Sequence, residues 1–182
     1  MLDYAAGSGY YTEILSRGSS SEGLILSHRL DPSRIAEGRL ERVSVLQDLD
    51  EIEPRSLDLV LIALAYHDLV NLDLERHSLL EQLRNALRPG GRIVVIDHAA
   101  AADSGGAAVA TLHRIDEAFV RDEMSAGGFE LVATSPLLRN PADPRTASIF
   151  DPAVRADPGG TDRFLLVFEE RGTEGVQIRG SD

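Results

Sequence analysis

The stretch Asp-Tyr-Ala-Ala-Gly-Ser-Gly-Tyr-Tyr-Thr-Glu, residues 3–13, places an acid directly before a glycine-rich turn and the start of a helix. Gly7 and Gly9 allow the backbone to approach a ligand and to adopt conformations that a side chain would forbid. The free N–H groups at the start of the helix, near Tyr10, face the turn. This order of acid, turn and helix predicts a cofactor site at the end of a first strand.

The same stretch departs from the fingerprint of dinucleotide-binding proteins. That fingerprint has a third small residue three positions after its second glycine, where this chain has Thr12. Hydride transfer with a nicotinamide cofactor therefore fits poorly. An acid that ends the strand suits a ligand with an ammonium and a sulfonium better than a pyrophosphate. The alternative is an ordinary strand–turn–helix corner that binds nothing.

Composition excludes several kinds of chemistry. The chain of 182 residues has no cysteine, and all 18 of its basic residues are arginine. Without lysine there is no P-loop lysine and no Schiff base, and without cysteine there is no thiol nucleophile, disulfide or thiolate metal site. The histidines, none of which forms a pair at metal-ligand spacing, are His28, His67, His77, His98 and His113. The sequence therefore predicts no dedicated metal site.

The formal net charge is −12, from 30 acidic and 18 basic residues. Binding to nucleic acid or to an anionic membrane needs a cationic face, so a small-molecule substrate is expected instead. No apolar run approaches the roughly 18 to 20 residues of a membrane span, and no signal-peptide pattern opens the chain. We expect a cytoplasmic protein with one domain over residues 1–170 and a polar, disordered tail over residues 171–182.

Strand and helix patterns alternate along the chain, which predicts an α/β fold with a doubly wound, mostly parallel sheet. The expected strands cover residues 2–3, 23–27, 42–46, 57–65, 92–97, 129–133 and 163–168. The expected helices cover residues 10–17, a short segment after Asp31-Pro32, residues 73–88, and a last helix that buries Ile115, Phe119, Val120 and Met124. Residues 99–112 are expected to be flexible. The proline-bearing loop before the last strand is too irregular for a crossover helix, which predicts a closing antiparallel pair.

Three motifs resemble those of the class I S-adenosylmethionine-dependent methyltransferases. Residues 3–9 are similar to the family pattern acid-x-Gly-x-Gly-x-Gly, with Ala5 in place of the first glycine. Residues 57–61, Leu-Asp-Leu-Val-Leu, resemble the family's fourth strand, and residues 87–92, Leu-Arg-Pro-Gly-Gly-Arg, resemble the turn before its fifth strand. With the closing antiparallel pair, the resemblance covers residues 1–170 and implies a Rossmann-like sheet of seven strands. Further segments similar to a bacterial group of predicted methyltransferases are residues 66–68, 113–116, 126–129 and 139–141.

The resemblance implies S-adenosylmethionine as cofactor and assigns a role to several residues. Asp3, Gly7 and Gly9 would hold its methionine part, and Asp48 would face the adenine amino group. The family usually has an acid at the end of the second strand to bind the ribose hydroxyls, where this chain has His28 and Arg29. A neutral histidine makes a weaker contact than a charged partner. The full set of implied cofactor-binding residues is Asp3, Ala5, Gly7, Ser8, Gly9, His28, Arg29, Asp48, Ala65 and Tyr66, the last two lining the floor.

Methyl transfer from a sulfonium depends mainly on alignment, and a general base is needed only for an acceptor that stays protonated. His67 and His113 are the candidates for that base, with structural hydrogen bonds as the alternative role for each. The implied substrate-binding residues are Asp68, His98, Arg114 and Arg139. A loop hydrogen bond is the alternative for His98, and a solvated surface position is the alternative for Arg139.

Two other function classes stay open at this point. A module that binds S-adenosylmethionine without catalysis fits Ala5 and the missing ribose acid, whereas a nicotinamide-dependent oxidoreductase fits less well. The start of the chain is also unusual, since only Met1 and Leu2 precede Asp3 and a central strand has about 5 to 6 residues. This predicts that the encoded protein begins upstream, where any targeting segment would lie; the alternative is a truncated product with an impaired core.

Overall fold

The computed structural model describes residues 1–19, 23–31, 33, 40, 42–72, 75–157 and 160–172. Most of the short helix expected after Asp31-Pro32 lies outside these residues. So do Asp73, which is expected to open a helix, and residues 173–182 of the expected tail. Among the described residues, no helix combines the length and the apolar character that a membrane crossing requires.

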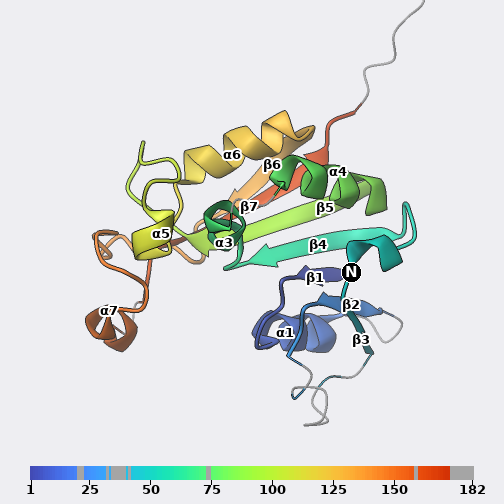
Figure 1. Cartoon of the computed structure of the whole chain (residues 1–182), viewed down its shortest axis with the longest axis horizontal. Helices are drawn as coiled ribbons and strands as arrows, with labels where there is room; N and C mark the ends of the chain where they lie inside the picture. Colours follow the sequence, from blue (N-terminus) through green and yellow to red (C-terminus); the bar gives the residue numbers. More distant parts are fainter. Residues whose placement is uncertain are drawn as a thin grey trace, which may run out of the picture.

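Seven strands form one sheet in the order β3-β2-β1-β4-β5-β7-β6 (Figure 1). Their bounds are β1 Leu2–Tyr4, β2 Ile25–His28, β3 Val43–Leu46, β4 Leu57–Ala63, β5 Leu87–His98, β6 Phe129–Ser135 and β7 Arg163–Glu170. Strand β7 runs antiparallel to both of its neighbours, and the other described pairings are parallel. The predicted doubly wound sheet with a closing antiparallel pair is confirmed.

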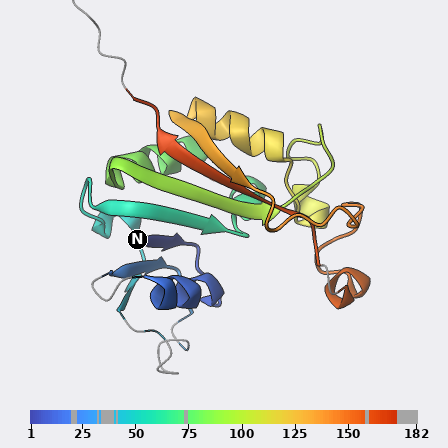
Figure 2. The same cartoon turned by 180° about the vertical axis from the view of Figure 1, so that it is seen from behind.

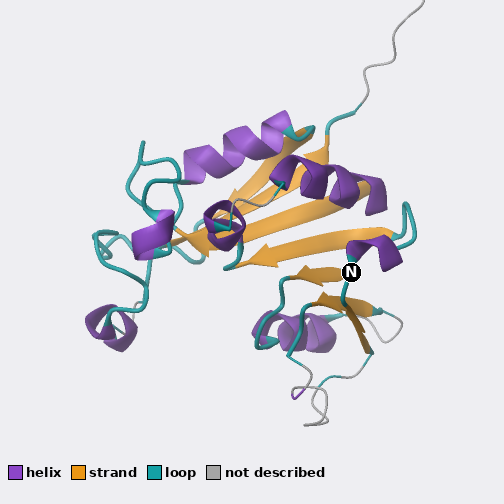
Figure 3. Ribbon diagram, in the orientation of Figure 1, coloured by secondary structure: helices purple, strands orange, loops and turns teal. Residues whose placement is uncertain are grey.

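Helices cover both faces of this sheet. Figures 1 and 2 show α4 and α6 over one face and α1 on the opposite face, and Figure 3 separates helices from strands by colour. The helices are α1 Tyr10–Gly18, α3 Tyr66–Asn71, α4 Arg76–Ala86, α5 Val109–Leu112, α6 Glu117–Ala126 and α7 Pro152–Ala156, with the 3-10 turn η1 Leu49–Glu51. Because strands β1 to β5 run parallel, their carboxyl ends meet at one edge of the sheet, beside α1 and α3.

The main core lies between the sheet and the helices α4 and α6. Ile93 and Val95 of β5 are fully buried there, together with Leu83 of α4 and Met124 of α6. Burial of such a side chain contributes about 1.5–3 kcal/mol relative to its exposure to water. This face of the sheet thus carries much of the hydrophobic stabilisation, and the carboxyl edge remains available for a site.

The junction between α4 and β5 differs from the prediction, which placed a Pro-Gly-Gly turn there. Helix α4 ends at Ala86, and β5 begins at Leu87, which pairs with Leu57 of β4. A Cβ on Gly91 would lie 2.9 Å from the backbone oxygens of Leu57 and Arg88. Only glycine fits this close approach, because real Cβ atoms avoid such short contacts. The Pro-Gly-Gly sequence therefore lies inside the start of β5 rather than before it.

Three short helices were absent from the sequence prediction. Strand β4 ends at Ala63 because Leu64 adopts a left-handed backbone conformation (φ 55°), and α3 then begins at Tyr66. Helix α5 lies within residues 99–112, and α7 lies in the long loop before β7. Helices of four to six residues are too short to show a repeating apolar pattern, which explains why the sequence did not reveal them.

Candidate active site

The turn after β1 is built by the two glycines that the sequence singled out. Gly7 (φ 53°) and Gly9 (φ 77°) both have left-handed backbone conformations, and Gly9 is the N-cap of α1. The turn is attached to β2, since the N–H of Ala6 donates to the carbonyl of His28 at 2.9 Å. Gly7 and Ser8 are exposed at the carboxyl edge, so a ligand can approach their backbone.

Ala5 occupies a left-handed conformation (φ 56°) at the position where the family pattern has glycine. This conformation costs a residue with a side chain about 1–2 kcal/mol, whereas glycine adopts it freely. The Ala5→Gly variant should therefore be more stable by about 0.5–1 kcal/mol, after the larger chain entropy of unfolded glycine is subtracted. Urea unfolding measures this difference. Ala6→Gly is the matched control, and its free energy of unfolding should fall by about 0.4–1 kcal/mol. An equal loss of stability in both variants would contradict the expected strain at Ala5.

Asp3 lies beneath the turn and is 2% exposed. The hydroxyl of Thr12 donates to its Oδ2 at 2.5 Å and also lies 3.0 Å from the hydroxyl of Ser27. Burial raises the pKa of Asp3 to about 6, although the hydrogen bonds from Thr12 favour the charged form. Asp3 therefore ties β1 to α1, and a cation bound above the turn would favour its ionised state.

This raised pKa makes a testable contribution to stability. The folded-state pKa of about 6 exceeds the ordinary value of 3.8, so protonated Asp3 stabilises the fold below about pH 4. That contribution is lost as the pH rises through about 6, by up to about 3 kcal/mol. Asn does not titrate, so the free energy of unfolding of Asp3→Asn should rise relative to that of the native chain as the pH increases from 4 to 7. Urea unfolding across this range checks it, and a difference that does not change with pH would contradict it.

A cavity of about 290 Å³ lies beside the ends of β2 and β3. His28, Arg29 and Asp48 line it, so the structure brings together the residues expected at the ribose and the adenine. The ring of His28 stacks on Tyr4 with centroids 4.6 Å apart, and its Nδ1 is buried without a partner among the described residues. Asp48 is exposed and caps η1 through the N–H of Asp50.

The expectation for Tyr66 needs correction. Its ring is 1% exposed in the hydrophobic core, and its hydroxyl donates to Glu123 of α6 at 2.8 Å. The side chain therefore points into the core rather than along the floor of a cofactor pocket. Ala65, the buried N-cap of α3, and the backbone of Tyr66 stay at the carboxyl edge.

His67 is held in one orientation by Asp97, the last acid of β5. Its backbone N–H donates to Oδ2 of Asp97 at 2.9 Å, and its Nδ1 lies 2.8 Å from Oδ1. Burial alone would lower the pKa of His67, but the hydrogen bond and charge of Asp97, with the charge of Asp68, outweigh it and raise the pKa. Asp97 was missed from the sequence, although an acid that ends a buried strand at the carboxyl edge was a usable signal.

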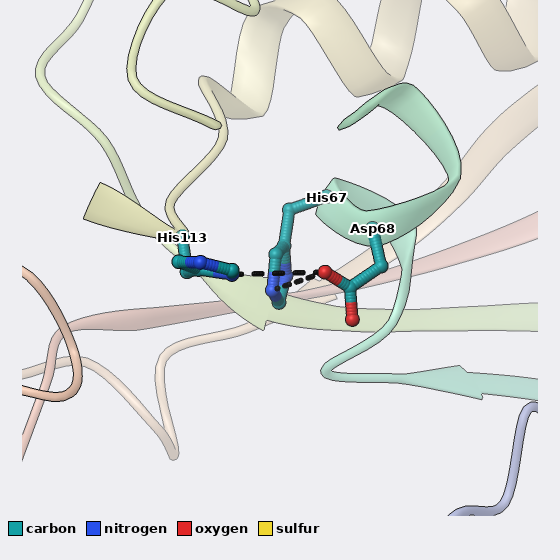
Figure 4. Close-up of side chains that lie close together, drawn as sticks. All are labelled: His67, Asp68 and His113. Carbon is teal, nitrogen blue, oxygen red and sulfur yellow. Dashed lines mark ion pairs between the residues drawn. The ribbon is translucent and has the colours of Figure 1, made fainter. Parts of the chain in front are cut away.

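His113 reaches the same place from the end of α5 (Figure 4). Its Nδ1 lies 3.6 Å from Oδ1 of Asp68, and Nε2 of His67 lies 3.5 Å from that oxygen. The rings of His67 and His113 meet edge to face with centroids 5.6 Å apart, and His113 also contacts Phe150. The structure thus brings the two candidate catalytic histidines together around Asp68.

Of the other expected substrate-binding residues, His98 lies near this cluster, with its ring centroid 6.1 Å from that of His67. His98 accepts or donates a 2.6 Å hydrogen bond with Thr161, and burial lowers its pKa to about 4, so its ring is neutral at physiological pH. Arg139 forms ion pairs with Glu117 and Asp162, which offset its charge. His98 therefore combines a loop hydrogen bond with a place at the site, and Arg139 is part of a salt-bridge network.

Arg114 is the second expectation that needs correction. Its side chain is completely buried, and its guanidinium donates to both carboxylate oxygens of Asp143. The remaining contacts go to the carbonyls of Ala99 and Ala147. The guanidinium is therefore occupied in fastening the long loop to β5 and does not face a substrate.

Residues 2–95 match the family model of the methyltransferase domain. The chain belongs to this family. No curated protein matches this chain. Family membership and the position of β7 argue against a nicotinamide-dependent oxidoreductase.

Solved structures with the same fold have low sequence identity to this methyltransferase. A type 11 methyltransferase from Sulfolobus solfataricus is 19% identical, with a TM-score of 0.64 over 99% of this chain and 88% of that chain. An S-adenosylmethionine-dependent methyltransferase from Aquifex aeolicus is 17% identical, with a TM-score of 0.65 over 92% of this chain and 79% of that chain. DhpI in complex with SAH is 19% identical, with a TM-score of 0.56 over 93% of this chain and 76% of that chain.

These findings confirm the class I methyltransferase fold and the expected cofactor, S-adenosylmethionine. The residues present fit this cofactor at two places. The left-handed glycine turn leaves its backbone open, and His28, Arg29 and Asp48 together line one cavity. When bound, the cofactor supplies a methyl group that is already activated by the sulfonium.

Proposed function

We propose that this methyltransferase transfers the methyl group of S-adenosylmethionine to a small-molecule acceptor bound beside His67 and His113. The supporting observation is that these two side chains converge at the carboxyl edge of the sheet. Strand β1 pairs directly with β4, so the glycine turn that follows β1 and the helix α3 that follows β4 lie at neighbouring strand ends. Open α/β sheets bind their ligands at this edge.

The reaction requires a lone pair on the acceptor and a straight path to the methyl carbon. The acceptor's oxygen or nitrogen forms a bond to that carbon, the carbon–sulfur bond breaks, and its electron pair returns to sulfur as a neutral thioether. The acceptor loses one proton in the process. We assign to His67 and His113, with Asp68, the task of binding the reacting atom and making it nucleophilic, while alignment contributes on the order of 7–11 kcal/mol.

A cavity of about 300 Å³ next to the histidines supports a small acceptor. His98, Phe150 and Thr161 line it, and Phe150 also contacts His113. Arg155 and Arg163 line it too, and Arg163 lies against Tyr11 in the first turn of α1. Cavities of this size hold small molecules, and two guanidinium groups favour an acceptor with a carboxylate or phosphate.

A thermal-shift comparison of S-adenosylhomocysteine with NAD tests the ligand class. A ligand at 100 times its dissociation constant adds about 2.7 kcal/mol to stability, so S-adenosylhomocysteine should raise the unfolding temperature and NAD should leave it unchanged. A shift with NAD alone would contradict the proposal. Binding of S-adenosylhomocysteine without turnover of S-adenosylmethionine on any acceptor would instead identify a non-catalytic binding module.

A further inference from the structure

His67, Asp68 and His113 each turn one potential metal-ligand atom toward a common point (Figure 4). One such atom from each residue lies within 4.8 Å of the other two, and Oδ1 of Asp68 is 3.5 Å and 3.6 Å from the two imidazole nitrogens. Ligand atoms around a tetrahedral zinc ion lie about 3.3 Å apart, because each bond is about 2.0–2.2 Å long. Small side-chain movements would therefore complete a set of three metal ligands.

The state of His67 is an independent observation. The carboxylate of Asp97 accepts the backbone N–H groups of His67 and His98, at 2.9 Å and 2.7 Å, so it acts as an acceptor. Nδ1 of His67, 2.8 Å from the same carboxylate, is consequently the donor. In the neutral ring the lone pair is then on Nε2, the atom that faces Asp68. Metal-binding histidines commonly donate their other ring N–H to a carboxylate in this way.

The backbone at His113 adds a further observation. His113 has a left-handed conformation (φ 51°, ψ 48°) directly after α5. For a residue with a side chain this costs about 1–2 kcal/mol, and such strain gathers at functional sites. The conformation directs the ring toward Asp68 and against Phe150. The position of the imidazole is thus maintained by the surrounding structure despite the strain.

We propose that His67, Asp68 and His113 bind a divalent first-row transition metal ion, which holds the reacting oxygen of a hydroxyl acceptor. Two imidazole nitrogens and one carboxylate favour zinc or iron over magnesium and calcium, which prefer oxygen ligands. Three protein ligands leave a position open for the acceptor. This inference rests on the proposed function, because the ion lies where the methyl acceptor is placed.

The ion explains how the acceptor becomes nucleophilic. A hydroxyl bound to a divalent cation has a lowered pKa, so it releases its proton to solvent near neutral pH. The freed lone pair then attacks the methyl carbon, and S-adenosylhomocysteine leaves as a neutral thioether. The sequence predicted no metal site because its spacing rules apply to histidines on one helix, whereas these ligands come from α3 and from the residue after α5.

Calorimetric titration of the EDTA-treated, dialysed full chain with Zn²⁺ tests the proposal. One ion should bind per chain, and Mg²⁺ should bind far more weakly. His113→Asn removes a ligand and keeps a residue that tolerates the left-handed conformation, and Asp68→Asn changes a half-exposed side chain without disturbing the core. Asp97→Asn removes the carboxylate that orients His67 and should lower the affinity for Zn²⁺ roughly 10- to 100-fold. His113→Asn and Asp68→Asn each remove a ligand and should lower it further. His77→Asn, on the exposed side of α4, is the matched control and should bind Zn²⁺ normally.

Co²⁺ titration provides a spectroscopic readout, because bound Co²⁺ should absorb visible light in the native chain and in His77→Asn but not in His113→Asn. Absence of Zn²⁺ binding, or equal affinity in the native chain, His113→Asn and Asp68→Asn, would overturn the proposal. Calorimetry with S-adenosylhomocysteine on the same samples separates the two claims. If S-adenosylhomocysteine binds and Zn²⁺ does not, only the metal site is wrong; if neither binds, the proposed function fails as well.

Discussion

The Gly7→Val variant is expected to abolish binding of S-adenosylhomocysteine while the chain still folds. A Cβ on Gly7 would meet only the carbonyl oxygen of Ala5, at 3.9 Å, so the protein itself leaves room for a side chain. The turn is exposed there, and a branched side chain would occupy the space that the cofactor needs. Calorimetry should show no heat of binding for the variant and a single site in the native chain.

Gly90→Val is the control for backbone strain in this experiment. Gly90 is also left-handed (φ 77°), and a Cβ there would meet nothing within 4 Å, but it lies at the start of β5, away from the glycine turn after β1. Both variants should lose stability, because a branched residue disfavours this conformation. Only Gly7→Val should lose the ligand. Unchanged affinity in Gly7→Val would place the cofactor elsewhere.

The His67→Asn variant is expected to lower the rate of methyl transfer by about 100- to 10,000-fold, the range for loss of a group that promotes removal of a proton. The substitution removes Nε2, which faces Asp68 and His113, and it leaves the glycine turn and the cavity beside His28 untouched. Affinity for S-adenosylhomocysteine should therefore change little. The measurement is formation of S-adenosylhomocysteine under saturating cofactor, with His77→Asn as control.

The outcome for His113 completes this test. His113→Asn should also slow methyl transfer, since its ring shares the same oxygen of Asp68. Suppose instead that His67→Asn, His113→Asn and the double variant all keep the native rate. The histidines would then be structural, and the enzyme would work by aligning an acceptor that is already nucleophilic.

Local features of the sequence were sufficient to predict the sheet. The glycines after Asp3, the apolar run that begins at Leu57 and the Pro-Gly-Gly sequence each mark a strand end within a few residues. The closing antiparallel pair followed from the irregular, proline-bearing loop. The structure confirmed these elements because each depends on residues that are neighbours in the chain.

The candidate site was less predictable because its contacts join distant segments. His67 meets Asp97 from β5 and His113 from the end of α5, and neither contact leaves a spacing pattern in the sequence. The ion pair of Arg114 with Asp143 is equally invisible, so a buried structural arginine was assigned to the substrate. Residue types pointed to the correct edge of the sheet, but only the folded chain shows which side chains are free to act.

Transfer of a labelled methyl group tests the central claim most directly. The native chain and Gly7→Val are incubated with methyl-labelled S-adenosylmethionine and a cell extract that has been separated into small molecules and macromolecules. Label is expected in an extracted small molecule, together with an equal amount of S-adenosylhomocysteine, for the native chain only. Label that appears only in protein or nucleic acid, or equal transfer by both proteins, would contradict it.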